Sequence, residues 1–180
     1  MAKQAKIHRS FHEHLILNRW VLSLLGQGSF ADLKSVLSDE RLIGLNEDGQ
    51  SRFFEAFQLR SLFPFSEKIS EEDVRRYDLN IVRHWQQITA KRNQDSGHPL
   101  QMKYFQYLSL LFTEIYLDWF FNRQAEMLAG LNETLANYQK EKGHLDLSDY
   151  QTADFNKIAF WKATGSGKTL LMHVNILQYQ

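Results

Sequence analysis

The stretch "YFQYLSLLFTEIYLDWFF", residues 104–121, decides the fold. Drawn as a helix, the segment from 100 to about 122 is apolar around most of its circumference. Its narrow polar stripe consists of Gln106, Ser109, Thr113 and Asp118. Helices of this kind are usually the central, buried members of a bundle, so the sequence predicts a mainly α fold built around this segment.

The segments on either side are also predicted to be helical. Ser70 is followed by three carboxylates and marks a helix start, because the first turn of a helix favours negative charge. Apolar residues then recur at spacings of three and four to about Arg92, and the polar stretch 93–99 ends the helix. Another helix is expected over about 124–142, before Gly143.

Shorter helices are expected toward the N-terminus. Apolar spacing predicts a helix over 4–25 that ends at Gly26, and Ser29 with Asp32 forms a capping-box-like start. The other expected elements are a helix from Ser29 to about Leu37, a turn over 46–51 and a helix over 52–63. We therefore expect residues 1–148 to form a helical bundle domain.

Composition narrows the class of protein. Lys plus Arg equals Asp plus Glu at 21 each, whereas domains that grip nucleic acid through phosphates usually carry a basic excess. The chain has no cysteine, which excludes disulfides and thiolate metal sites. The first 20 residues lack the apolar core of a signal peptide, and the most apolar window, 107–121, is too short to span a bilayer. A soluble, cytoplasmic protein without a membrane partner is expected.

The pattern changes in the segment "KIAFWKATGSGKTLLMHVNILQYQ", residues 157–180. Residues 157–161 are short and apolar and are predicted to form a buried strand, and residues 167–179 are predicted to be helical. The Gly-rich turn between them has the order of elements that a phosphate-binding loop needs. Its candidate nucleotide-binding residues are Thr164, Gly165, Ser166, Gly167, Lys168 and Thr169.

Each residue type in this loop has a physical reason to be there. The glycines allow the backbone to approach phosphates closely, and the following helix presents its positive end to the anion. Lys168 would reach the β- and γ-phosphates of ATP, and the Thr169 hydroxyl would hold Mg²⁺. The strict pattern has Gly where this chain has Lys162, so a purely structural Gly-rich turn remains the alternative.

The segment "FWKATGSGKTLLMHVNILQY" (160–179) resembles motif I of superfamily 2 DEAD/DEAH-type helicases. It is most similar to the form found in the Res subunits of type III restriction enzymes. The aromatic segment 104–121 also resembles the helical region before motif I in a bacterial group of helicase-like proteins. The resemblance implies ATP-driven unwinding or translocation on DNA by two RecA-like domains, and a hydrolase with ATP and Mg²⁺ as cofactors.

On this resemblance, residues 149–180 are expected to be the start of a RecA-like α/β domain, truncated after motif I. The family's Asp-Glu motif and arginine finger come later, so we expect no catalytic residue in the chain and no ATP hydrolysis by it alone. The expected partners are DNA, bound by the full-length parent, and a methyltransferase or another defence-system subunit. Residues 157–180 are expected either to dock on the helical bundle or to be poorly ordered.

Weaker candidate sites have plainer explanations. His8 and His12 lie one helical turn apart beside Glu13, but the two-histidine zinc motif fails and exposed or capping histidines are expected. Glu114 and Asp118 resemble a carboxylate pair for acid–base chemistry, yet a polar stripe bonded to neighbouring helices is the expected arrangement. The aromatic residues of 104–121 are expected to pack in the core rather than stack on bases.

Two other functions stay open. The chain would be a helical protein-interaction module if the loop served only in packing, and a Lys168 substitution would then leave its function unchanged. A P-loop ATPase of another kind, such as a secretion motor, is the third possibility, against which the missing first glycine at Lys162 argues.

Overall fold

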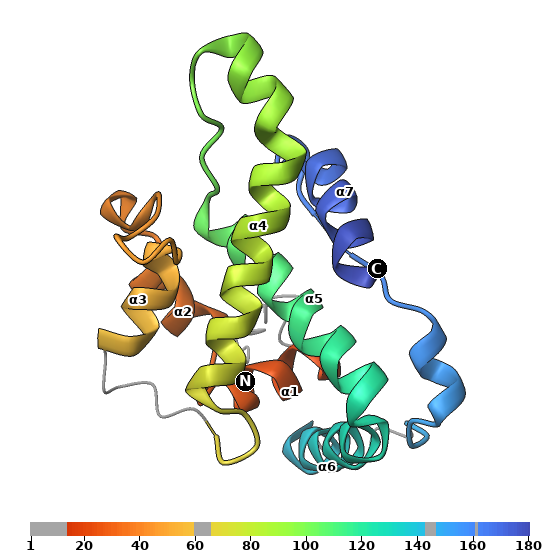
Figure 1. The fold of residues 1–180 in the computed structure, drawn as a ribbon. Coiled ribbons are helices and arrows are strands. Elements are labelled where there is room, and N and C mark those ends of the chain that lie inside the picture. The colour runs from red at the N-terminus through yellow and green to blue at the C-terminus, as the bar shows by residue number, and fades with distance from the viewer. Residues whose placement is uncertain (1–13, 60–65, 143–146, 161) are drawn as a thin grey trace, which may run out of the picture.

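The computed structural model describes residues 14–59, 66–142, 147–160 and 162–180, and over these ranges the chain is mainly helical, as predicted (Figure 1). The α-helices are α1 (Ile16–Leu24), α2 (Phe30–Leu37), α3 (Arg52–Leu59), α4 (Glu71–Ser96), α5 (Tyr104–Asn122), α6 (Gln124–Lys142) and α7 (Lys168–Tyr179). The short 3-10 helices are η2 (Glu40–Leu42) and η3 (Thr152–Asn156).

Helix α5 is the central element, which confirms the prediction for the segment around 104–121. It contacts α1, α4, α6 and α7, and α6 crosses below it at the base of the view in Figure 1. Four of its residues are fully buried: Tyr107, Leu110, Leu111 and Ile115. The aromatic Trp119 packs edge-on against Trp20 of α1, with 5.1 Å between ring centroids. Burial on so many sides explains why this helix lacks a broad polar face.

Helix α4 begins as its sequence predicts. Ser70 accepts a hydrogen bond from the Asp73 backbone N–H, and the Asp73 carboxylate accepts one from the Ser70 backbone N–H. The helix continues four residues past Arg92, to Ser96, and ends at Gly97 in the left-handed conformation. The polar stretch stays helical because the Asn93 side chain donates to Thr89 and accepts from the Leu100 backbone N–H.

The N-terminal elements pack through one close approach. Helix α1 contacts α6, and a Cβ built on Gly130 would lie 2.5 Å from the indole nitrogen of Trp20. Only glycine at position 130 therefore lets α1 come this near to α6. Residues 4–13 of the helix predicted over 4–25 lie outside the described residues, and the part that begins at Ile16 is confirmed.

The region of α2 and α3 confirms its predicted local signals. Ser29 caps α2 by accepting from the Asp32 backbone N–H, and the Asn46 carbonyl accepts from Gly49 in the predicted turn. The end of the helix predicted over 52–63 falls partly outside the described residues. Buried Asp78 of α4 accepts hydrogen bonds from both the backbone N–H and the hydroxyl of Ser51, which ties the start of α3 to α4.

The strand predicted over 157–161 is not present in the described residues 157–160: Lys157 has an extended backbone, but none of the four belongs to a strand. A strand needs a neighbouring strand for its ladder of hydrogen bonds, and the described ranges contain only one isolated bridge, between Leu45 and Ser51. The prediction of a strand in this chain was therefore wrong for these four residues.

Helix α7 docks on the bundle, which is one of the two outcomes expected for 157–180. It lies against α4 and α5 (Figure 1), and its Leu171 and Val174 belong to the same buried cluster as the α5 core residues. The division of the chain at residue 148 stays a prediction. The described part of α7, however, shares its core with the helices before that point.

Candidate phosphate-binding loop

The loop before α7 has the backbone form that its glycines predict. Gly165 and Gly167 have φ angles of 80° and 83°, a region that side chains with a Cβ rarely enter. The Ser166 backbone N–H donates to the Ala163 carbonyl at 3.3 Å, which closes a turn. Gly167 is the N-cap of α7, so the loop leads directly into the positive end of a helix of 12 residues.

The predicted site residues are mostly open to solvent. Thr164, Gly165, Lys168 and Thr169 are exposed, whereas Ser166 and Gly167 are half-buried. The Lys168 ammonium donates to the carbonyl of Lys162 at 3.4 Å, so its side chain folds back across the loop to the point where the loop begins. Lys168 and Thr169 occupy the first turn of α7, where their polar ends can reach an anion held by the loop.

Lys162 stands at the first position of the loop, where the strict motif has glycine. Its side chain is half-buried, and this burial lowers the pKa of its ammonium group from 10.5 to about 8. A bound anion would favour the charged form of this amine. The substitution therefore adds a titratable cation at the start of the loop.

Sequence reasoning missed one contact of the loop, the one made by Gln106. Its Nε2 atom donates to the Ser166 carbonyl at 3.1 Å, and its Oε1 atom accepts from the Lys103 backbone N–H at 2.8 Å. A signal for this role existed, because Gln106 belongs to the polar stripe of an otherwise apolar helix. The stripe indicates bonded neighbours but does not say which segment supplies them.

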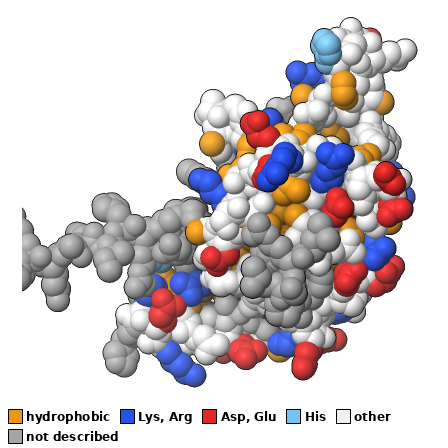
Figure 2. Space-filling model, turned by 90° about the vertical axis from the view of Figure 1, so that its left-hand side faces the viewer, with side chains coloured by type: hydrophobic (Ala, Val, Ile, Leu, Met, Phe, Trp, Pro, Cys, Tyr) orange, Lys and Arg blue, Asp and Glu red, His pale blue; other side chains and the backbone are white. Residues whose placement is uncertain are grey.

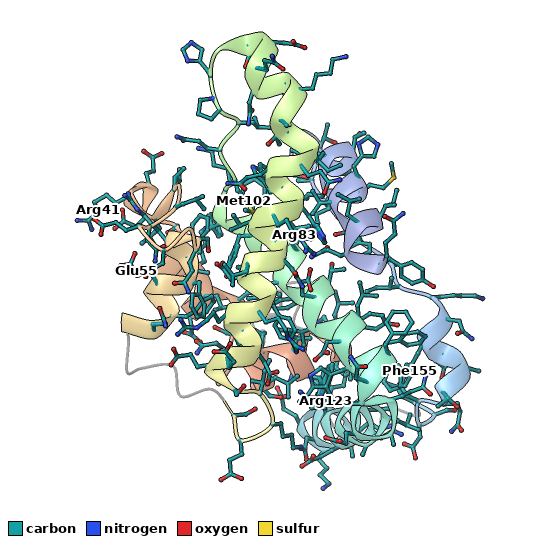
Figure 3. All side chains as sticks on the ribbon, in the orientation of Figure 1. Arg41, Glu55, Arg83, Met102, Arg123 and Phe155 are labelled. Carbon is teal, nitrogen blue, oxygen red and sulfur yellow. The ribbon has the colours of Figure 1, made fainter. Side chains whose placement is uncertain are left out.

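Glu114 and Asp118 do not form an acid–base pair, and each is bonded to neighbouring helices, as expected. Glu114 accepts from the Gln178 side chain of α7 at 2.9 Å. Burial raises the pKa of Glu114 to about 7, and its hydrogen bonds to Gln178 and Asn80 partly oppose that rise. Arg83 projects from α4 on the side of α7 (Figure 3), and its charge also lowers the pKa of Glu114.

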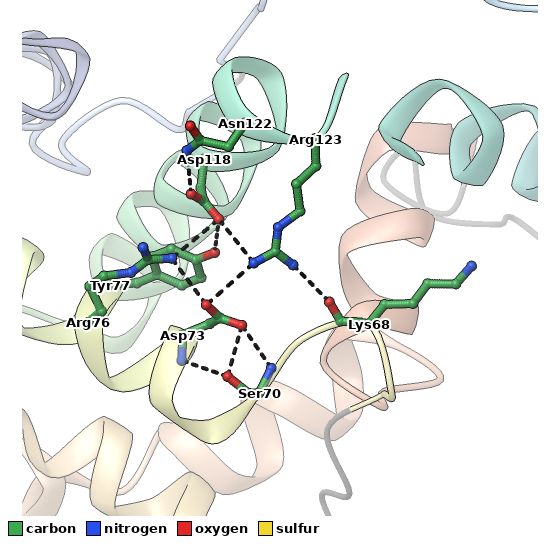
Figure 4. Close-up of polar contacts among 8 residues, drawn as sticks. All are labelled: Lys68, Ser70, Asp73, Arg76, Tyr77, Asp118, Asn122 and Arg123. Carbon is green, nitrogen blue, oxygen red and sulfur yellow. Dashed lines mark hydrogen bonds and ion pairs between the residues drawn. The ribbon is translucent and has the colours of Figure 1, made fainter. Parts of the chain in front are cut away.

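Asp118 lies in a closed network between α4 and α5 (Figure 4). Its carboxylate accepts from the Tyr77 hydroxyl at 2.5 Å and from Asn122 at 2.8 Å. Arg76 approaches it at 3.4 Å and Arg123 at 4.0 Å. Burial, followed by the hydrogen bond to Asp118, raises the pKa of the Tyr77 phenol well above its usual range. With every oxygen engaged, the network is structural rather than a reactive centre.

The remaining candidates from the sequence are the N-terminal histidines and the aromatic residues of α5. His14 contacts the Tyr138 hydroxyl at 2.6 Å, whereas His8 and His12 lie outside the described residues. Among the described residues, no cluster of three or more acidic or histidine side chains is placed to hold a metal ion. Tyr107, Tyr116 and Trp119 are buried in the core as predicted, although other aromatic residues of α5, including Phe121, are exposed.

The surface agrees with the balanced composition. Acidic and basic side chains are interspersed on the face shown in Figure 2, without a patch of one sign. In the described ranges, none of the helices combines the length and apolar character that crossing a bilayer requires. The chain matches no protein-family model, no curated protein and no solved structure. Support for the candidate site therefore comes from the residues and geometry of this chain alone.

Proposed function

We propose that this chain binds the phosphates of ATP at residues 164–169. The observation that carries the proposal is the exposed loop with two positive-φ glycines that opens directly into α7, with Lys168 in the first turn. Backbone N–H groups at the start of a helix are free to bind anions, and the helix dipole adds to that attraction.

In this proposal, the residues of the loop have different roles in binding phosphate and Mg²⁺. Lys168 leaves the Lys162 carbonyl, its weak 3.4 Å acceptor, and pairs with the β- and γ-phosphate oxygens. The Thr169 hydroxyl would be a ligand for Mg²⁺, which would neutralise phosphate charge when bound. Gly165 and Gly167 keep the backbone close to the anion because they carry no side chain.

The parent activity that we infer is that of an ATP-dependent helicase or translocase acting on DNA. The support is the likeness of 160–179 to motif I of superfamily 2 helicases, above all the Res subunits of type III restriction enzymes. On the same ground we propose a cytoplasmic defence-system role, with a methyltransferase or a similar subunit as partner. The RecA-like identity of residues 149–180 is part of this proposal.

Binding of a fluorescent ATP analogue with Mg²⁺ tests the proposal. Lys168→Ala should weaken binding about tenfold or more, because a charge-assisted hydrogen bond contributes about 1.5–3 kcal/mol. The matched control is Lys157→Ala, which removes an exposed lysine that precedes the loop. Equal affinity of the two variants, or no binding by the unaltered chain, would contradict the proposal.

A helical protein-interaction module is the second candidate, and one observation favours it. Leu171 and Val174 of α7 are buried in the bundle core, so the loop and α7 also have a packing role. If packing were their whole purpose, Lys168→Ala would leave every function of the chain unchanged. The same titration therefore separates the two candidates.

A further inference from the structure

We propose that Gln106 of α5 is a positioning residue for the phosphate-binding loop, because it sets the orientation of the Ser166–Gly167 peptide. The inference rests on the proposed function and names how the helical bundle prepares that site. Gln106 lies 60 residues before Ser166 in sequence and outside the loop motif, so it is recognised only from the fold.

The side-chain amide of Gln106 has one possible orientation. Its Oε1 atom accepts from the Lys103 backbone N–H at 2.8 Å, so the Gln106 side chain satisfies this backbone group at the start of α5. The Nε2 group must therefore face the other way, and it donates to the Ser166 carbonyl at 3.1 Å. The residue is buried at 9% exposure, so water competes weakly for these two bonds.

The contact with Ser166 has a consequence for the next N–H group. A trans peptide is planar, and its C=O and N–H point in opposite directions. With the Ser166 carbonyl held toward Gln106, the Gly167 N–H points away from α5. Rotation of this peptide would exchange a donor for a carbonyl in the lining of the loop, and a carbonyl repels phosphate.

Gly167 lies close to the same Gln106 amide group. A Cβ built on Gly167 would lie 2.8 Å from the Gln106 Nε2 atom, closer than such atoms come in real structures. By contrast, a Cβ on Gly165 would meet nothing within 4 Å. Both glycines have a positive φ, but only at Gly167 would a Cβ also displace the Gln106 amide from its bond to Ser166.

Two isosteric variants separate the roles of the Gln106 amide. Gln106→Glu keeps the acceptor for Lys103 but loses the donor to Ser166, whereas Gln106→Met loses both and carries no charge. The added negative charge is matched by Gln101→Glu, at an exposed residue that precedes α5. The probe is the fluorescent ATP analogue with Mg²⁺, and thermal unfolding and amide exchange over 163–168 are followed alongside.

Both Gln106 variants should weaken binding of the analogue about fivefold, the effect expected for one lost hydrogen bond. Amide exchange in the loop should become faster, while Gln106→Glu still unfolds in one cooperative transition, at a temperature lowered by the lost bond to Ser166 and the buried charge. Gln101→Glu should leave the affinity, the amide exchange and the unfolding temperature unchanged. This combination distinguishes loss of loop orientation from loss of folding.

Three results would overturn the inference. Unchanged affinity in Gln106→Met, with Lys168→Ala still weakening binding, would refute the role of Gln106 and leave the proposed function intact. Weaker binding only in Gln106→Glu would assign the effect to charge. If the unaltered chain does not bind the analogue, the proposed function and this inference fail together.

Discussion

The two ends of α5 hold their neighbours in different ways. Near its C-terminal end, Asp118 is bound by a tyrosine, an asparagine and two arginines, and the network is closed (Figure 4). Near its N-terminal end, a single donor of Gln106 holds the loop, whose other residues are mostly exposed. Polar groups at the C-terminal end of α5 therefore hold the fold together, whereas the N-terminal end leaves backbone donors of the loop available to a ligand.

Breaking the Asp118 network should have the largest effect on the free energy of unfolding. Asp118→Ala leaves the Tyr77 hydroxyl without its acceptor and takes one carboxylate partner from exposed Arg76 and half-buried Arg123, and it should destabilise the fold by about 3 kcal/mol. Chemical denaturation of the variant measures the loss. Affinity for the ATP analogue should stay unchanged, because Asp118 does not contact the loop.

Two variants sharpen this result. Asp118→Asn keeps an acceptor for Tyr77 but removes the charge, so it should lose about half as much stability. Asp95→Ala removes an exposed carboxylate of α4 and should have almost no effect. A loss below about 0.5 kcal/mol for Asp118→Ala would mean that the network does not stabilise the fold.

The middle of α5 should show the next largest effect, and it depends on pH. Burial raises the pKa of Glu114 from 4.5 to about 7, so the folded state binds more protons than the unfolded state between these values. The contribution of Glu114 to stability is therefore greatest below pH 4.5 and is lost as the pH rises toward 7. Glu114→Gln should remove this fall, which is on the order of 2 kcal/mol.

Denaturation of the unaltered chain and of Glu114→Gln at pH 5 and pH 8 measures the loss of stability that Glu114 causes as the pH rises. The difference between the two proteins should favour the variant more at pH 8 than at pH 5. Glu47→Gln, at an exposed residue of the 46–51 turn, is the matched control and should not change with pH in this way. An identical difference at both pH values would show that Glu114 does not titrate near 7.

Changes at the open end should affect stability least and binding most. Gly167→Ala places a Cβ both at a positive φ and against Gln106, whereas Gly165→Ala meets only the backbone cost of about 1–2 kcal/mol. Gly167→Ala should therefore weaken binding of the ATP analogue more than Gly165→Ala, by about fivefold. Equal losses from the two substitutions would contradict the close approach of Gln106.

Local signals in the sequence predicted most of the helices. Ser29 and Ser70 cap α2 and α4 through their own side chains, and such contacts span only three residues. The central position of α5 also follows from its own composition, because a helix that is apolar on most sides must be covered. Gly97 ends α4 later than predicted, since Asn93 found partners at Thr89 and Leu100.

Features that depend on distant segments were not predicted. The contact between Gln106 and Ser166 joins residues far apart in the chain, and neither residue type identifies its partner. The predicted strand at 157–161 failed over 157–160, because an apolar run specifies burial but cannot supply a second strand. The loop residues 164–169 were predicted together because they are contiguous, and their nucleotide stays a prediction.

The shared direction of α5 and α7 has an electrostatic consequence. Gln106 meets Ser166 where both helices begin, and Gln178 near the end of α7 meets Leu110 and Glu114 farther along α5. Two helix macrodipoles are thus aligned, and their positive ends lie beside the same loop. The chain has equal numbers of acidic and basic residues, yet two aligned helix dipoles favour a positive potential at the loop. Such a potential speeds the encounter with anions and weakens as salt is added.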